Sequence, residues 1–229
     1  MIEIEGRQIP STIEELVDPK HAALICIDMQ NDICSPGGRE DKMGRDYRSC
    51  AAILPTVAKV QAAARKAGVF IIHTQSSTYP DHRSDSPAWL RFKYRNYIPE
   101  GETDFSLPGS WGDAFADEVK PRKGDLTIRK VRPDAFVATD LDLLLRCNGM
   151  RTVVLTGVVT QGCVEATARG AAYHDYFVVV LKDCVASTVK KYHDASLMMM
   201  DYRFDVASAE EAIGAWSKVI RAAGTKGRC

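Results

Sequence analysis

The amino-acid sequence predicts an α/β fold: a mainly parallel, six-stranded, doubly wound sheet with helices on both faces, in a Rossmann-like three-layer arrangement. Short apolar runs alternate with helical patterns along the 229 residues, which is typical of a parallel sheet. The sequence contains no repeat, low-complexity segment or linker. We therefore expect a single domain over residues 1–229.

Local signals place the expected elements. The alanine-rich segment 51–67 predicts a helix that ends at Gly68, and Thr139 marks the start of a helix that stops at Asn148. The stretch from about 75 to 110 is too long for an ordinary connection, so we expect an excursion that covers the substrate site. Strands are expected at 21–27, 69–73, 126–129, 152–157, 177–181 and near Val206, and further helices at 163–173, 192–202 and from Ser208.

Composition excludes several classes of partner. Thirty basic and thirty acidic side chains cancel without a basic stripe, so no nucleic-acid partner is expected. The apolar runs are too short to span a bilayer, and the first residues lack a signal-peptide pattern. Seven cysteines, an odd number without a C-x-x-C pair, indicate a reduced protein. We expect a cytoplasmic protein without membrane contact.

Three reactive side chains are expected at one edge of the sheet. Asp28, Lys130 and Cys163 each follow or end an expected strand. Ligands of such sheets bind outside the carboxyl ends of the strands, so these residues form a candidate active site. Each also has an ordinary structural explanation: cysteines are commonly buried, an aspartate can cap a turn, and a lysine at a strand end is usually solvated.

Cys163 has the most informative context, because it lies where an apolar strand turns into a helix. The positive end of that helix is expected to favour the thiolate, and Gly162 leaves room for another molecule. Asp28 would take the thiol proton, and Lys130 would stabilise negative charge on a carbonyl oxygen. The backbone N–H groups of Val159 and Cys163 are expected to form an oxyanion hole. This combination suits acyl transfer from an amide.

Three segments resemble the isochorismatase-like cysteine hydrolases, namely residues 18–32, 130–141 and 157–168. That group includes nicotinamidases, N-carbamoylsarcosine amidohydrolase, ureidoacrylate amidohydrolases, and biuret and triuret hydrolases. The resemblance implies a catalytic triad of Asp28, Lys130 and Cys163, with Cys163 as nucleophile. It also implies a cis peptide bond between Val158 and Val159. Isochorismate vinyl-ether hydrolases lack the cysteine, so the resemblance argues against that chemistry.

The resemblance also bears on the substrate. The Asp-x-His metal motif of nicotinamidases is missing after the second strand, so neither a metal nor another cofactor is expected. Residues 84–91 resemble ureidoacrylate hydrolases, whereas residues 161–164 resemble N-carbamoylsarcosine amidohydrolase. The expected substrate is a small carbamoyl or ureido amide, with biuret, triuret, N-carbamoyl amino acids and ureidoacrylate all open. The candidate substrate-contact residues are Gln30, Asn31, Tyr79, Trp89, Arg91, Arg132 and Gln161.

Two other functions stay open. A non-catalytic protein of the same fold would use the same edge of the sheet to bind a small ligand. A thiol redox enzyme would need a second cysteine close to Cys163, and none is near in sequence. The resemblance further suggests a homodimer or homotetramer, for which apolar helices near the C-terminus would supply the interface.

Overall fold

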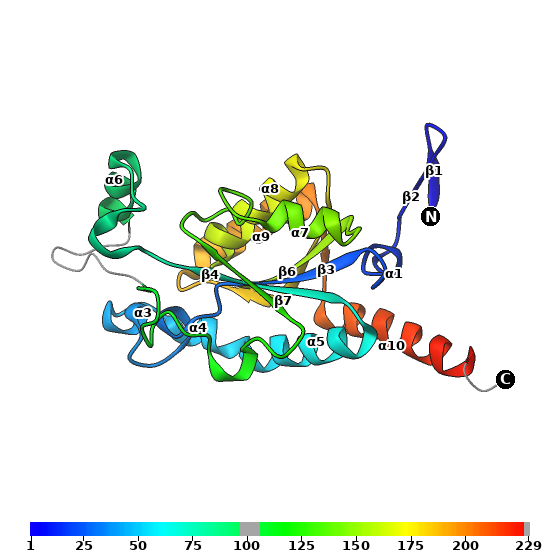
Figure 1. Cartoon of the computed structure of the whole chain (residues 1–229), viewed down its shortest axis with the longest axis horizontal. Helices are drawn as coiled ribbons and strands as arrows, with labels where there is room; N and C mark the ends of the chain where they lie inside the picture. The colour runs from blue at the N-terminus through cyan, green and yellow to red at the C-terminus, as the bar shows by residue number, and fades with distance from the viewer. Residues whose placement is uncertain (97–105, 227–229) are drawn as a thin grey trace.

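The computed structural model describes residues 1–96 and 106–226 and contains a six-stranded sheet in which every neighbouring pair is parallel. Helices cover both faces (Figure 1). This arrangement confirms the predicted doubly wound α/β class. From edge to edge the strands are β5 (Leu126–Lys130), β4 (Phe70–Ser76), β3 (Ala22–Ile27), β6 (Thr152–Val158), β7 (Phe177–Ala186) and β8 (Asp205–Ala207).

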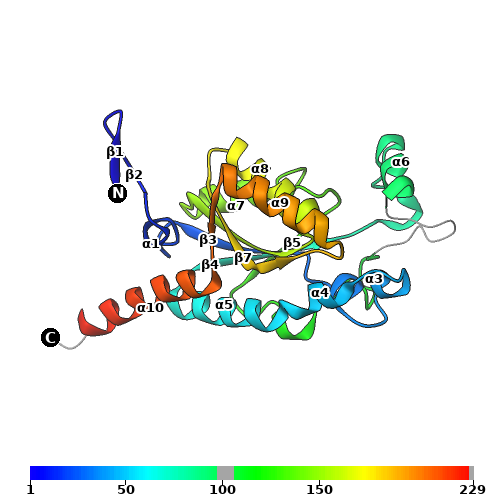
Figure 2. The ribbon, with the colours of Figure 1, turned by 180° about the vertical axis from the view of Figure 1, so that it is seen from behind.

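The two faces of the sheet carry separate hydrophobic cores, because successive side chains of a strand point to opposite sides. The helices over the sheet are α4 (Tyr47–Ala52), α5 (Leu54–Ala67), α7 (Leu141–Cys147), α8 (Glu165–Tyr173), α9 (Lys190–Arg203) and α10 (Ala209–Lys226). In β3, Leu24 packs on the side of α4, α5 and α10, whereas Ile25 packs on the side of α7, α8 and α9. Figure 2 shows the same layers from behind.

The predicted boundaries differ from the observed ones in several places. The helix expected at 51–67 is two helices, and Pro55 lies in the first turn of the second, where its missing N–H costs no hydrogen bond. Strand β7 extends five residues beyond the expected end, to Ala186. The N-terminal hairpin was not predicted; its strands are β1 (Ile2–Ile4) and β2 (Arg7–Ile9), and α1 (Ile13–Leu16) follows it.

The helices of the described chain give no membrane span, since none is both long and apolar enough to cross a bilayer. The expected excursion holds the 3-10 turn η1 (Pro80–His82) and helix α6 (Pro87–Asn96), which stands away from the sheet in Figure 1. The part of the excursion at 97–105 lies outside the described residues. The remaining short elements are α2 (Asn31–Cys34), α3 (Arg39–Lys42) and the 3-10 turn η2 (Asp117–Val119), which packs against α5.

Candidate active site

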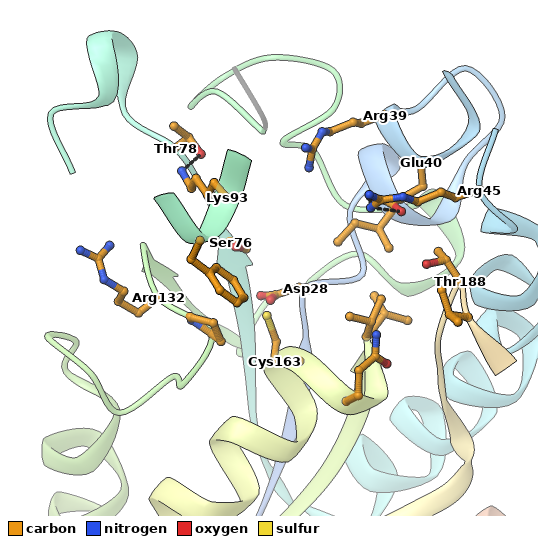
Figure 3. Close-up of a pocket in the computed structure, with 18 of the residues that line it drawn as sticks. Asp28, Arg39, Glu40, Arg45, Ser76, Thr78, Lys93, Arg132, Cys163 and Thr188 are labelled. Atoms are coloured by element: carbon orange, nitrogen blue, oxygen red, sulfur yellow. Dashed lines mark hydrogen bonds and ion pairs between the residues drawn. The ribbon is translucent and has the colours of Figure 1, made fainter. Parts of the chain in front are cut away.

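Asp28, Lys130 and Cys163 meet at the carboxyl end of the sheet. Lys130 Nζ lies 2.7 Å from Asp28 Oδ2 and 3.2 Å from Cys163 Sγ. The Asp28 carboxylate also contacts the thiol, and Figure 3 shows the two groups side by side. Both charged side chains are completely buried. Three segments that are remote in sequence therefore bring a carboxylate, an ammonium and a sulfur into contact, as expected from their positions at the ends of strands.

Asp28 and Lys130 are each held by further hydrogen bonds. The Thr74 hydroxyl donates to Asp28 Oδ1 at 2.6 Å, and the Asp28 backbone N–H donates to the Thr74 carbonyl at 3.2 Å. Lys130 Nζ donates to the carbonyl of Arg132 at 3.1 Å. The three N–H donors of Lys130 are thus matched by Asp28, Cys163 and a carbonyl. This network fixes the orientation of both charged groups.

Burial and charge set the ionisation of the sulfur and the ammonium. Burial raises the pKa of the Cys163 thiol to about 12; Asp28 adds to this effect and Lys130 opposes it. Burial by itself disfavours the charged form of Lys130, but Asp28 and Cys163 raise its pKa above the usual value. Without substrate, the Cys163 sulfur is therefore protonated and lies next to the Lys130 ammonium ion.

Cys163 lies in a π-helical turn, η3 (Thr160–Val164), that precedes α8, and not at the first residue of an α-helix as expected. The Ser196 hydroxyl of α9 donates to Glu165 Oε2 at 2.6 Å and lies 3.3 Å from the Thr160 carbonyl oxygen. His193 contacts the Thr160 hydroxyl at 2.8 Å. Helix α9 thereby holds both ends of the turn that carries the nucleophile candidate.

The peptide bond between Val158 and Val159 is cis, as the family resemblance implied. It connects the end of β6 to the turn that carries Cys163. Val159 and Cys163 both line the adjacent cavity. The oxyanion role of their backbone N–H groups stays a prediction.

A cavity of about 570 Å³ opens beside Asp28 and Cys163 (Figure 3). Its size suits a small molecule. Its walls come from α3, α6, the segment after β5 and the segment before α9. The described lining includes Ile33, Arg39, Glu40, Arg45, Ser76, Ser77, Thr78, Trp89, Phe92, Lys93, Arg95, Val131, Arg132, Pro133, Val158, Val159, Gln161, Gly162, Thr188, Val189 and Tyr192.

Three predicted substrate-contact residues line this cavity: Trp89, Arg132 and Gln161. The guanidinium carbon of Arg132 lies 5.2 Å from the centre of the Trp89 ring, which in turn stacks on Phe92. Trp89 Nε1 and Gln161 Oε1 are buried without a hydrogen-bond partner among the described residues. A bound ligand could accept a hydrogen bond from the indole nitrogen and donate one to the amide oxygen.

The other four predicted contacts, Gln30, Asn31, Tyr79 and Arg91, are not among the described lining residues. The fully buried Gln30 amide donates to the Ser76 and Asp113 carbonyls at 3.0 Å each. Its oxygen accepts the Ser76 backbone N–H at 2.8 Å. Asn31 donates to the Trp111 carbonyl at 3.0 Å. The side-chain amides of Gln30 and Asn31 thus bind the backbone of neighbouring segments. Tyr79 and Arg91 are exposed and lie outside the cavity.

Sequence reasoning missed the basic residues that α3 and α6 contribute to the cavity, Arg39, Lys93 and Arg95. The only sequence signal for them is the number of basic residues in the segments that follow β3 and β4. Within the described part of the chain, no group of three or more histidine, cysteine, aspartate or glutamate side chains could hold a metal ion.

Comparisons with known proteins agree with this architecture. Residues 22–212 match the family model described as an isochorismatase domain. Ureidoacrylate amidohydrolase RutB of Methylobacterium radiotolerans is 34% identical over a 228-residue alignment covering 93% of this chain and 88% of that protein. A solved cysteine hydrolase of Pseudomonas syringae pv. phaseolicola 1448A has a TM-score of 0.77 at 24% identity, covering 89% of this chain and 96% of that one, and supports the fold.

A second solved structure, N-carbamoylsarcosine amidase of Thermoplasma acidophilum, has a TM-score of 0.67 at 27% identity. The match covers 83% of this chain and 97% of that one. The family model spans most of the chain, and the RutB relative is covered over 88% of its own length. The chain therefore belongs to the isochorismatase domain family.

Proposed function

We propose that the protein is a cysteine-dependent amidohydrolase that cleaves a C–N bond of a small carbamoyl or ureido compound through a covalent acyl-enzyme. The observation that carries this proposal is the contact of Lys130 Nζ with Asp28 at 2.7 Å and with Cys163 Sγ at 3.2 Å. The names of the relatives, ureidoacrylate amidohydrolase and N-carbamoylsarcosine amidase, support amide hydrolysis of this class.

The first half of the reaction forms the acyl-enzyme. Because the resting sulfur is protonated, attack on the substrate carbonyl requires a base, and the Asp28 carboxylate in contact with the thiol accepts its proton. Sγ forms a bond to the carbonyl carbon, and the oxygen becomes an oxyanion that the Lys130 charge and the backbone N–H groups stabilise. Asp28 then returns the proton to the nitrogen, the C–N bond breaks, and ammonia or an amine leaves.

The second half regenerates the thiol. Water enters, Asp28 accepts one of its protons, and the oxygen attacks the thioester-type carbonyl. The C–S bond breaks as Asp28 returns this proton to sulfur, and a carbamic acid or another acid departs. Atoms and charge balance over the cycle without a cofactor step.

Ammonia release from purified protein tests the proposal, using biuret, triuret, N-carbamoyl amino acids and ureidoacrylate as substrates. Cys163→Ser should reduce kcat/KM at least about a thousandfold, because the hydroxyl is a far weaker nucleophile. Asp28→Asn should reduce it by about 10²–10⁴-fold through loss of proton transfer. Cys147→Ser, a change at an exposed cysteine outside the cavity, is the matched control and should retain activity.

The same assay separates the enzyme from a non-catalytic binding protein of the same fold. Binding of these ureides without any Cys163-dependent ammonia release would favour the binding protein. Wild-type turnover by Cys163→Ser would refute the proposed nucleophile. Unfolding midpoints of all variants should be measured alongside, since Asp28→Asn removes the buried partner of Lys130.

We also propose that the protein assembles as a homodimer or homotetramer. Helix α9 exposes Tyr192, Met198, Met199 and Tyr202, and Tyr202 is 84% exposed. Such a cluster suits contact with a second copy of the chain. Light scattering on the purified protein measures the state directly, and a monomer at micromolar concentration would contradict this expectation.

A further inference from the structure

Lys93 of α6 is a buried ammonium group in the wall of the cavity. Only 9% of the residue is exposed, and it is one of the residues that line the cavity. Its Nζ lies 2.7 Å from Asp85 Oδ2 and 3.0 Å from Thr78 Oγ1. An ammonium group has three N–H donors, and the described residues provide acceptors for two of them. The third donor depends on what occupies the cavity, since an unmatched buried donor costs free energy.

The contacts of this ammonium group hold it in one position. Asp85 has only 1% of its side chain exposed, and its Oδ2 also lies 2.9 Å from His82 Nδ1. Thr78 is equally buried, and Figure 3 shows its hydroxyl in contact with Lys93. Asp85 balances the charge of the ammonium group as well as orienting it. Lys93 therefore presents a fixed hydrogen-bond donor to the cavity.

The position of Thr78 separates this donor from the reacting carbonyl. Ser76, the last residue of β4, pairs in register with Lys130 of β5, and Thr78 lies two residues farther along the chain. In Figure 3, Ser76 lies between Asp28 and Lys93. When the reacting carbonyl of a substrate lies at the sulfur, Lys93 therefore faces the other end of that substrate.

Two other basic groups of the lining are less suitable for this contact. Arg132 Nη1 donates to the Ser84 carbonyl at 3.0 Å and to the Val131 carbonyl at 2.6 Å. In Figure 3 its guanidinium group is turned away from Cys163. Arg95 is exposed at the end of α6, so water competes for its N–H groups.

We propose that Lys93 donates its third N–H to an oxygen at the far end of the substrate, so that the enzyme selects ureides with a second carbonyl or carboxylate group over alkylureas. This inference rests on the proposed function and names the substrate class within it. Because Asp85 balances the ammonium charge, a neutral carbonyl oxygen is a sufficient acceptor. A hydrogen bond from a charged donor is stronger than one between neutral groups. An alkyl group at this position leaves the donor unmatched.

Equilibrium binding to the Cys163→Ser protein tests the inference independently of turnover. Three ligands of similar shape are compared by NMR titration: 3-ureidopropionamide, N-carbamoyl-β-alanine, and N-isopentylurea, in which an isopropyl group replaces the amide or carboxylate. In the same background, Lys93→Met should weaken both oxygen-bearing ligands at least about tenfold, as expected for a hydrogen bond to a charged group. N-isopentylurea should stay within about twofold. Arg91→Met, a change at an exposed charge on the same helix outside the cavity, should leave all three ligands within about twofold.

The amide ligand decides the outcome. Weakening of 3-ureidopropionamide without weakening of N-isopentylurea supports the proposal. Equal weakening of all three ligands, or no change in any, overturns it. Weakening of the carboxylate ligand alone also overturns it, because that result would indicate attraction by charge and not a hydrogen bond.

A second variant guards against misfolding, since Lys93→Met leaves the Asp85 carboxylate buried without its ammonium partner. If that protein does not fold, the double variant Asp85→Asn/Lys93→Met removes both charges and is judged by the same comparison. Absence of ureide hydrolysis by the native enzyme, with the selective effect of Lys93→Met intact, would refute the proposed function alone.

Discussion

At the scale of single residues, Lys130 connects the two partners that carry the proposed chemistry. Its ammonium group contacts both the Asp28 carboxylate and the Cys163 sulfur, and none of its side chain is exposed. Burial nevertheless keeps the pKa of the thiol at about 12. The positive end of the helix was expected to favour a thiolate, but desolvation of the sulfur outweighs that effect. The sulfur therefore depends on Asp28 as a base during attack.

This ionisation predicts how Cys163 responds to alkylation. The reactive species is the thiolate, and its fraction keeps rising with pH below a pKa of about 12. The iodoacetamide labelling rate at Cys163 should therefore rise about tenfold per pH unit from pH 6 to 9, as followed by peptide mass spectrometry. A bound ureide should protect the residue. A rate that is level over this range would show that the thiolate already forms at neutral pH.

At the scale of elements, the approach of β6 to β3 determines where the Cys163 turn begins. Gly157 has φ +116° near the end of β6, and its pairing partner is Ile27, the residue before Asp28. A Cβ atom at this position would overlap the backbone of Ile27. The absence of a side chain therefore allows the two strand ends that carry Asp28 and Cys163 to lie close together.

Gly157→Ala should lower the free energy of unfolding by more than about 3 kcal/mol, because it adds backbone overlap to an unfavourable φ. Gly68→Ala is the matched control: its φ is +77°, but open space surrounds the added methyl group. That change should cost about 1–2 kcal/mol. Urea unfolding of both variants measures the difference. Equal losses would show that backbone conformation, and not the close approach of the strands, governs position 157.

At the scale of the whole molecule, the buried histidine His73 on β4 is expected to make stability depend on pH in the acid range. Burial lowers the pKa of His73 from the usual 6.5 to about 4, although Asp125 at 3.1 Å opposes that shift. The folded protein therefore keeps the ring neutral while the unfolded chain takes up a proton. The stabilisation is complete above pH 6.5 and is lost as the pH falls toward 4.

The free energy of unfolding should accordingly fall by up to about 1.4 kcal/mol per pH unit between pH 6.5 and 4 on account of this one residue. His73→Gln should reduce the slope, because glutamine takes up no proton in either state. Urea titrations at pH 7, 6, 5 and 4.5 compare the two proteins. Parallel slopes would assign the acid sensitivity to other groups.

Much of the fold was predictable because apolar periodicity and strand-end chemistry are local signals. Asp28, Lys130 and Cys163 follow or end strands of one parallel sheet, so topology alone brings them to one edge. Gln30 and Asn31 also follow a strand, yet their amides bind loop backbone. A side-chain amide that follows a strand can bind either a substrate or the backbone of a neighbouring loop. Which of the two it binds depends on how distant segments fold over the strand ends, and the local sequence does not show this.

The same limit explains Arg39. It contributes to the cavity because α3, a helix of four residues that follows β3 along the chain, forms part of the cavity wall. A short charged helix after a strand has no pattern that distinguishes a cavity wall from a solvated surface. The single-domain boundaries and the cytoplasmic location stay predictions.

The hairpin at the start of the chain and the far end of α10 lie on the side of the sheet opposite α3 and α6 (Figures 1 and 2). The cavity opens between α3 and α6. An affinity tag or a fusion partner at either end would therefore leave the entrance clear. Immobilisation through such a tag should orient the entrance toward the solution, which suits sensor-based detection of small ligands.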